Sequence, residues 1–125
     1  MNTVLTIKGR EKLVKARAGE ASLSPITHMA FGNGAVDETG NVIIPLNTDI
    51  NLKYELLRKP ILILNYPTST SCRYRGVIEK AELVGESINE IALIDSDGDI
   101  VAINVFLEKL KDSNSELAFE IDDTF

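Results

Sequence analysis

The order of apolar and polar residues first predicts one helix near the start of the chain. Thr6 can cap a helix over residues 7–18, and Gly19 stands where a left-handed C-terminal cap would fall. Gly9 weakens the first turn of this helix, because glycine has low helix propensity. We expect one apolar stripe at helical spacing, formed by Ile7, Leu13, Val14 and Ala18.

After the helix, the pattern changes to the alternation that is typical of strands. Residues 26–31 alternate, with His28 among apolar residues on one face, and we expect a strand there. Gly32-Asn33-Gly34 follows and predicts a tight turn with positive φ. Residues 35–54 are polar and rich in turn formers apart from residues 42–45, which predicts a long surface excursion.

A second extended segment is predicted over residues 56–66, with Pro60 at a bulge or at a sheet edge. Residues 61–64 are apolar on both faces, so this part should be covered on both sides or lie in an interface. Residues 67–70 then form a hairpin loop, and residues 71–79 return as a strand. Cys72, Tyr74 and Ile78 share one face of that strand, and Arg73, Arg75 and Val77 share the other.

The acidic half of the chain contains three further predicted strands. Residues 91–94 and 100–106 flank Asp97-Gly98, and Asp-Gly between two apolar runs indicates a hairpin. The last residues alternate strictly, which predicts a half-buried antiparallel strand. The expected inward residues are Leu117, Phe119, Ile121 and Phe125, and the expected outward residues are Glu116, Glu120, Asp122 and Thr124. The fold class is therefore α+β, an N-terminal helix followed by a mainly antiparallel sheet or sandwich.

Length and composition predict one globular domain over residues 1–125. Hydrophobic residues make up 44% and charged residues 26% of the chain, which is enough to build a core. No apolar run approaches the ~20 residues of a membrane span, and no signal peptide is recognisable at the start. Cys72 is the only cysteine, so the chain has no internal disulfide and suits a reducing cytoplasm.

The net charge of −6 is unevenly distributed. Residues 8–17 carry a balance of +4, whereas residues 79–125 carry a balance of −10. A surface this acidic repels phosphate backbones, so we expect no nucleic-acid binding. The basic segment either forms a solvated helix face or docks on the acidic half or on a neighbouring subunit.

The residues available for catalysis are few. His28 and Cys72 are the only histidine and cysteine, and both fall on apolar faces of predicted strands. A satisfied core histidine and a buried, inert thiol are therefore expected, although a Cys–His pair in a cleft remains an alternative. The set of zinc ligands is too small for a zinc site, and no helix signal follows Gly32-Asn33-Gly34 to form a phosphate-binding loop. We expect no catalytic residues and no cofactor.

Asp95, Asp97 and Asp99 are the best candidates for metal ligands. Three carboxylates in five residues resemble the start of a calcium loop, but the glycine and the twelfth position do not match an EF-hand. We expect a solvated hairpin turn, with a weak calcium site as the alternative. The carboxylate pairs Asp122–Asp123 and Glu86–Glu90 are expected to be solvated surface, because no basic partner or apolar pocket is recognisable beside them.

Five ordered segments together resemble the N-terminal domain of the bacteriophage tail-collar fibre and tail-fibre protein family, over nearly the whole chain. They are Leu5-Thr6-x-Lys8-Gly9-Arg10-Glu11-x-Leu13 with Ala16-x-Ala18-Gly19, Ile26-x-x-Met29-Ala30-Phe31-Gly32-Asn33-Gly34, Glu55-x-x-Arg58-Lys59-Pro60-Ile61, Ile88-Asn89-Glu90-Ile91-Ala92-Leu93 with Asp97-Gly98-Asp99-Ile100-Val101-Ala102, and Leu117-x-Phe119-x-Ile121 with Phe125. Asn89 and Ala92 differ from the arginine and glycine that are common in the family at these positions.

The resemblance implies a non-enzymatic virion component, made in the bacterial host cytoplasm, that attaches or adapts a receptor-binding fibre to the tail baseplate. It implies self-association, with a trimer as the expected count, and contacts with other tail or baseplate proteins. Fibre proteins of the family usually continue into a long shaft, whereas this sequence ends at Phe125 with its last predicted strand. We therefore expect a short adaptor or a stand-alone baseplate component.

Such a protein acts through surfaces, and the strand pattern suggests where they lie. The interface candidates are Arg58, Pro60, Ile61, Ile63, Arg73 and Arg75. Ion pairs from these arginines would set register more than affinity. Two alternatives from other classes are a small acidic regulator or inhibitor that binds a basic protein surface, and an enzyme that uses Cys72 or His28.

Overall fold

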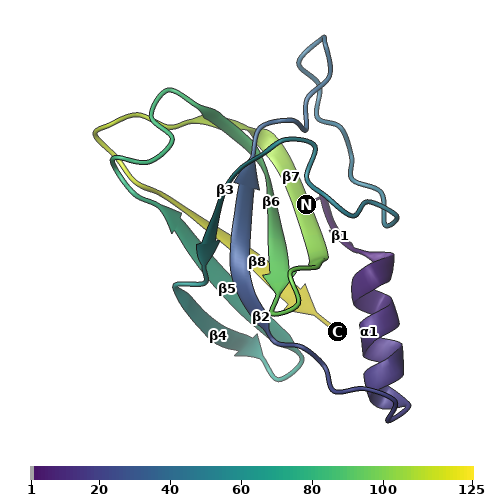
Figure 1. The fold of residues 1–125 in the computed structure, drawn as a ribbon. Coiled ribbons are helices and arrows are strands. Elements are labelled where there is room, and N and C mark those ends of the chain that lie inside the picture. Colours follow the sequence, from purple (N-terminus) through teal and green to yellow (C-terminus); the bar gives the residue numbers. More distant parts are fainter. Residues whose placement is uncertain (1) are drawn as a thin grey trace.

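The computed structural model describes residues 2–125, and it consists of two packed β-sheets with one helix beside them (Figure 1). The elements in chain order are β1 (Asn2–Leu5), α1 (Ile7–Arg17), β2 (Ile26–Gly32), β3 (Glu55–Pro60), β4 (Ile63–Thr68), β5 (Ser71–Ile78), β6 (Ser87–Asp95), β7 (Ile100–Leu110) and β8 (Leu117–Thr124). One sheet has the strand order β1-β7-β6-β2-β3, the other has the order β4-β5-β8, and every pairing is antiparallel. The predicted α+β class is confirmed, in its sandwich form.

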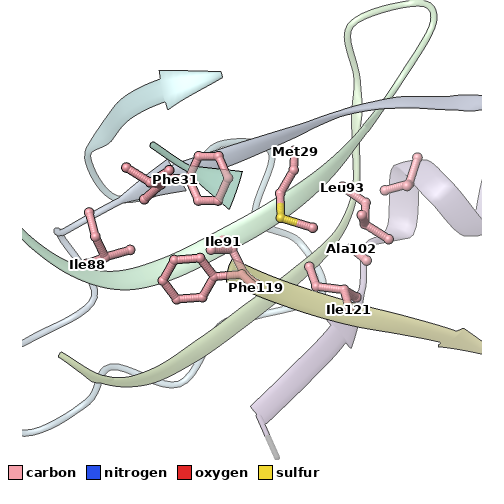
Figure 2. Packing of buried hydrophobic residues seen from close by; sticks show 10 residues of the cluster. Met29, Phe31, Ile88, Ile91, Leu93, Ala102, Phe119 and Ile121 are labelled. Atoms are coloured by element: carbon pink, nitrogen blue, oxygen red, sulfur yellow. The ribbon is translucent and has the colours of Figure 1, made fainter. Parts of the chain in front are cut away.

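The main core lies between the two sheets. Met29 and Phe31 of β2 belong to one cluster with Phe119 and Ile121 of β8 (Figure 2). The rings of Phe31 and Phe119 are tilted, with centroids 5.7 Å apart. Gly76 of β5 lets the sheets approach closely, because a Cβ atom there would lie 2.8 Å from the sulfur of Met29. Burial of this apolar surface is the main force that holds the two layers together.

The long segment 35–54 covers the other face of the five-stranded sheet. It contains no strand, as the sequence predicts, and a single isolated bridge joins Val36 to Val42. The segment nevertheless buries Ala35 and Leu52 in a second apolar cluster with residues of β2, β6 and β7. The excursion is therefore packed onto the sheet and is part of the fold.

Both ends of α1 agree with the prediction. The Thr6 hydroxyl accepts a hydrogen bond from the Gly9 amide at 3.0 Å and donates one to the Ile100 carbonyl at 2.8 Å. Thr6 thus caps the helix and also ties it to β7. Gly19 has a φ of +81°, the left-handed conformation expected after the last turn.

The predicted apolar stripe of α1 is wrong for Ile7, Val14 and Ala18, which are exposed, whereas Leu13 is half-buried. Ile7 and Val14 are 40% and 68% exposed, whereas Gly9 is buried. A Cβ atom on Gly9 would lie only 2.9 Å from the Val101 carbonyl oxygen. The helix therefore approaches β7 most closely at the glycine that lowers its helix propensity.

The prediction of positive φ at Gly32 and Gly34 is also wrong, because neither residue adopts it. Both are needed for space. A Cβ atom on Gly34 would lie 2.7 Å from the Cβ of Lys53, and one on Gly32 would collide with the Tyr54 carbonyl oxygen. Close packing against the segment before β3 explains these glycines.

The extended segment predicted across Pro60 is two strands in different sheets. The chain crosses between the sheets immediately after β3. The Ile61 amide donates to the Thr27 carbonyl beside one sheet, and the Leu62 amide donates to the Arg75 carbonyl in the other, both at 2.9 Å. The predicted edge position of Pro60 is confirmed, since β3 is the outermost strand of its sheet.

The two ends of the chain differ from the prediction. β1 was not predicted, and it pairs with β7 at the edge of the five-stranded sheet. Phe125 is 67% exposed and lies beyond the last residue of β8, so its predicted inward position is wrong.

The predicted hairpin between β6 and β7 is confirmed, with Gly98 at a φ of +86°. No helix among residues 2–125 is long and apolar enough to cross a bilayer.

Candidate functional site

Three carboxylates meet at the turn between β6 and β7, as their spacing suggests. One oxygen from each of Asp95, Asp97 and Asp99 lies within 4.8 Å of the others. The Nζ atom of Lys12, from α1, lies 2.5 Å, 3.0 Å and 2.7 Å from these carboxylates. The lysine ammonium therefore supplies the positive charge that a bound cation would otherwise provide.

The predicted solvated turn is wrong for Asp95, whose side chain is 1% exposed. Its Oδ1 atom accepts the amides of Asp97 and Asp99 at 3.0 Å and 3.1 Å, while its Oδ2 atom meets Lys12. Burial lowers the pKa of Lys12, but its hydrogen bonds to the three carboxylates outweigh burial and raise that pKa above the usual value. Hydrogen bonds from Ser24 and Lys12 lower the pKa of Asp97. The cluster thus holds α1 on the β6–β7 turn.

The basic residues of α1 fall into two groups. Lys12 docks on the acidic half of the same chain through this cluster. The remaining basic residues of the helix are exposed, and they are Lys8, Arg10, Lys15 and Arg17.

Glu90 of β6 forms a second polar clamp. It is 1% exposed, and its carboxylate accepts the amides of Gly34, Lys53 and Tyr54 at 2.8–2.9 Å. Its neighbour Asn89 also bonds to the segment after β2. The prediction of a solvated carboxylate at Glu90 is wrong, because the long loop folds back over the N-terminal part of β6 and needs acceptors for its amides.

His28 and Cys72 lie in different sheets. His28 is half-buried in β2, and its Nδ1 atom lies 2.8 Å from the Thr27 hydroxyl. Cys72 is half-buried in β5 and pairs with Asp123 of β8. Both are less buried than predicted, and the strand pairing does not place them beside each other.

The apolar run at the start of β4 is not covered on both sides within the chain. Leu62, Ile63 and Leu64 are 60%, 55% and 47% exposed, and only Ile61 packs against the core. All six residues of β4 are exposed. The prediction that this run forms an interface stays open.

The arginines among the interface candidates have carboxylate partners in their own chain. The pairs are Arg58–Glu55 at 2.9 Å, Arg73–Asp122 at 2.8 Å and Arg75–Glu120 at 4.0 Å. Arg73 and Asp122 are directly opposite in the register of β5 and β8, and a hydrogen bond from the arginine lowers the pKa of this carboxyl. A partner protein would have to compete with these pairs or extend them.

A hollow of about 150 Å³ between α1 and the end of β8 was not predicted. Leu13, Leu23, Tyr74, Asp123 and Phe125 line part of it. Asp123 is half-buried, and burial raises its pKa, so the prediction of a solvated carboxylate there is wrong. The alternation of β8 carries the missed signal, because position 123 continues the inward series of positions 117, 119 and 121.

Comparison with known proteins adds one finding to this geometry. No curated protein and no solved structure matches the chain. The model of the phage tail-collar fibre protein family, N-terminal domain, matches residues 1–120, in agreement with the resemblance of the five segments. The chain therefore belongs to the phage tail-collar fibre protein family and is a structural part of a phage tail.

Proposed function

We propose that this chain attaches or adapts a receptor-binding fibre to the tail baseplate, and that it acts by binding other proteins without catalysis. It would be made in the cytoplasm of the bacterial host and then assemble with copies of itself and with other tail proteins. A trimer is the assembly that the family resemblance favours.

The exposure of β4 is the observation that carries the proposal. This strand forms an edge of the three-stranded sheet, so one side of its backbone is free to bond to another chain. Its apolar residues Ile63 and Leu64, with Leu62 before them, remain largely exposed. Exposed apolar surface at an open sheet edge is typical of a protein interface.

Ile63→Asp tests this interface. The new carboxylate would lie opposite Arg75 in the register of β4 and β5, so the monomer should tolerate it. We expect the mass measured by light scattering to fall from that of the assembly toward the 13.7 kDa of one chain. Far-UV circular dichroism should stay unchanged.

Leu107→Asp is the matched control, because Leu107 is an equally apolar residue, 76% exposed, on β7 of the other sheet. It should leave the assembled mass as it is. An unchanged mass for Ile63→Asp, or its global unfolding, would count against an interface at β4.

The division of His28 and Cys72 between two sheets supports the non-enzymatic part of the proposal. A nucleophile and its base need to lie within hydrogen-bonding reach. The polar clusters around Asp95 and Glu90 are each saturated by contacts within the chain, which suits a structural role.

A further inference from the structure

Two adjoining hollows share one wall near the end of β8. The first lies beside α1, and the second lies along the β4–β5 turn. Tyr74, Asp123 and Phe125 line both of them. The surface around this wall carries exposed apolar groups, since Leu23, Tyr66 and Phe125 are 50%, 73% and 67% exposed.

The charge of this region is negative. The charged residues that line the first hollow are Lys12, Asp95 and Asp123, and Lys12 is already shared among three carboxylates. Among residues 2–125, no ion pair involves Asp123, whereas its neighbour Asp122 is paired with Arg73. A half-buried carboxylate without a cation is costly to the fold, and an incoming positive charge would offset that cost.

The aromatic residues around Asp123 favour one kind of cationic group. Tyr66, Tyr74 and Phe125 line the second hollow together with Asp123. A guanidinium group can stack on aromatic rings and bind a carboxylate with two parallel hydrogen bonds. We propose that this double hollow binds an arginine side chain of a partner protein, with Asp123 as its ion-pair partner and Tyr74 and Phe125 as its walls.

The raised pKa of Asp123, caused by burial, fits a carboxylate that lacks a cation in the free protein. The proposed site shares only Tyr66 with β4 and includes none of the apolar residues 62–64, so it can fail while the β4 interface holds, or hold while that interface fails. The two proposals are therefore tested independently.

The first test is an NMR titration of the full chain with Nα-acetyl-arginine methyl amide as the probe. We expect saturable amide shifts at Tyr74, Asp123 and Phe125, with a dissociation constant on the order of millimolar because one side chain makes few contacts. The citrulline analogue has almost the same shape without the charge, and it should bind about tenfold more weakly or not at all.

Equal binding of the two probes would overturn the proposal, as would the absence of saturable shifts. Shifts of the same residues that grow with protein concentration alone would also overturn it, because a second copy of the chain would then fill the hollow.

Two variants locate the site. Asp123→Asn should abolish the preference for arginine over citrulline, whereas Asp122→Asn, on the opposite face of β8, should retain it. Tyr66→Ala removes an exposed ring and should weaken arginine binding several-fold with an unchanged circular dichroism spectrum. Retention of the arginine preference in Asp123→Asn would place the binding elsewhere and overturn the assignment.

Discussion

The absence of a Cβ atom at two glycines determines how closely the elements of this protein approach each other. At Gly9 and Gly34, a Cβ atom would lie 2.9 Å and 2.7 Å from the nearest atom of a neighbouring segment. Real Cβ atoms very rarely come so close, so any larger residue would force the segments apart. The helix therefore lies close to β7, and the loop lies close to the segment before β3, only because these positions lack side chains.

Gly9→Ala should lower the free energy of unfolding by about 1–3 kcal/mol, because the added methyl group meets the Val101 carbonyl. Helix propensity alone predicts the opposite sign, a gain of about 0.5–1 kcal/mol. Urea unfolding followed by circular dichroism distinguishes the two. Lys8→Ala is the control on the exposed face of the same helix, and it should change stability by less than about 0.5 kcal/mol. A Gly9→Ala variant as stable as the wild type would show that the helix is not pressed against β7.

At the scale of elements, polar contacts help to fix the position of the helix. Thr6 links its first turn to β7, and Lys12 links its second turn to the β6–β7 turn. The side chain of Lys12 is 19% exposed, so the charge cluster is partly shielded from water. Removing one partner of a shielded ion pair therefore destabilises the fold more than removing one partner of an exposed pair does.

Lys12→Met should lower the free energy of unfolding by about 2–3 kcal/mol. The loss arises because Asp95 remains buried without its cation, and it is at the lower end for a broken buried pair because Lys12 reaches the surface. Arg10→Met is the matched control, since Arg10 is exposed on the same helix. Thermal unfolding of both variants measures the difference. Equal melting temperatures would mean that the cluster does not hold the helix.

The sequence predicted most elements correctly, and its error around Pro60 has a physical cause. The β6–β7 hairpin, β2 and β8 follow from alternation and from Asp-Gly, which are local signals. The division of the segment around Pro60 into β3 and β4 is not local, because both halves have the same extended pattern. Which sheet each half joins depends on pairing with β2 and β5.

At the scale of the whole molecule, opposite charges that are far apart in the sequence are brought together. Lys12 meets residues 95–99, Lys59 meets Glu82 at 2.6 Å, and Arg73 meets Asp122. The acidic half is therefore neutralised in part by contacts within the chain. These contacts make the stability of the protein depend on pH.

Acid should destabilise the protein. Several carboxyl groups have pKa values below their usual values of 3.8 for Asp and 4.5 for Glu, and they are Asp37, Glu82, Asp97, Asp112 and Asp122. The folded state therefore favours their ionised forms, so their contribution is complete above about pH 4.5 and is lost as the pH falls below it. Asp123 has the opposite sign, since its raised pKa makes its ionised form unfavourable to the fold.

The measurement is the midpoint of urea unfolding from about pH 7 to about pH 3 at constant ionic strength. We expect the midpoint to fall most steeply below about pH 4.5. Lys59→Met removes the partner that lowers the pKa of Glu82, so its midpoint should fall less over the same range. A midpoint that is constant or that rises on acidification would contradict these assignments.

Features that depend on near neighbours along the chain were predictable from the residue pattern alone. Thr6 as a cap, Gly19 as a C-terminal stop, the turn at Gly98 and the inward series at Phe119 and Ile121 all follow from local geometry and alternation, and so does the α+β class. The five ordered segments also indicated the family.

The packing of the folded chain determined which surfaces meet. It buried Gly9 and left Val14 exposed, placed Lys12 among three carboxylates more than 80 positions away, and sheltered Asp123 in a hollow. The spacing of apolar residues shows which face of a segment is apolar. Whether that face is buried also depends on the segment that covers it. That covering segment comes from distant strands and loops, and its position is set by the packing of the whole chain.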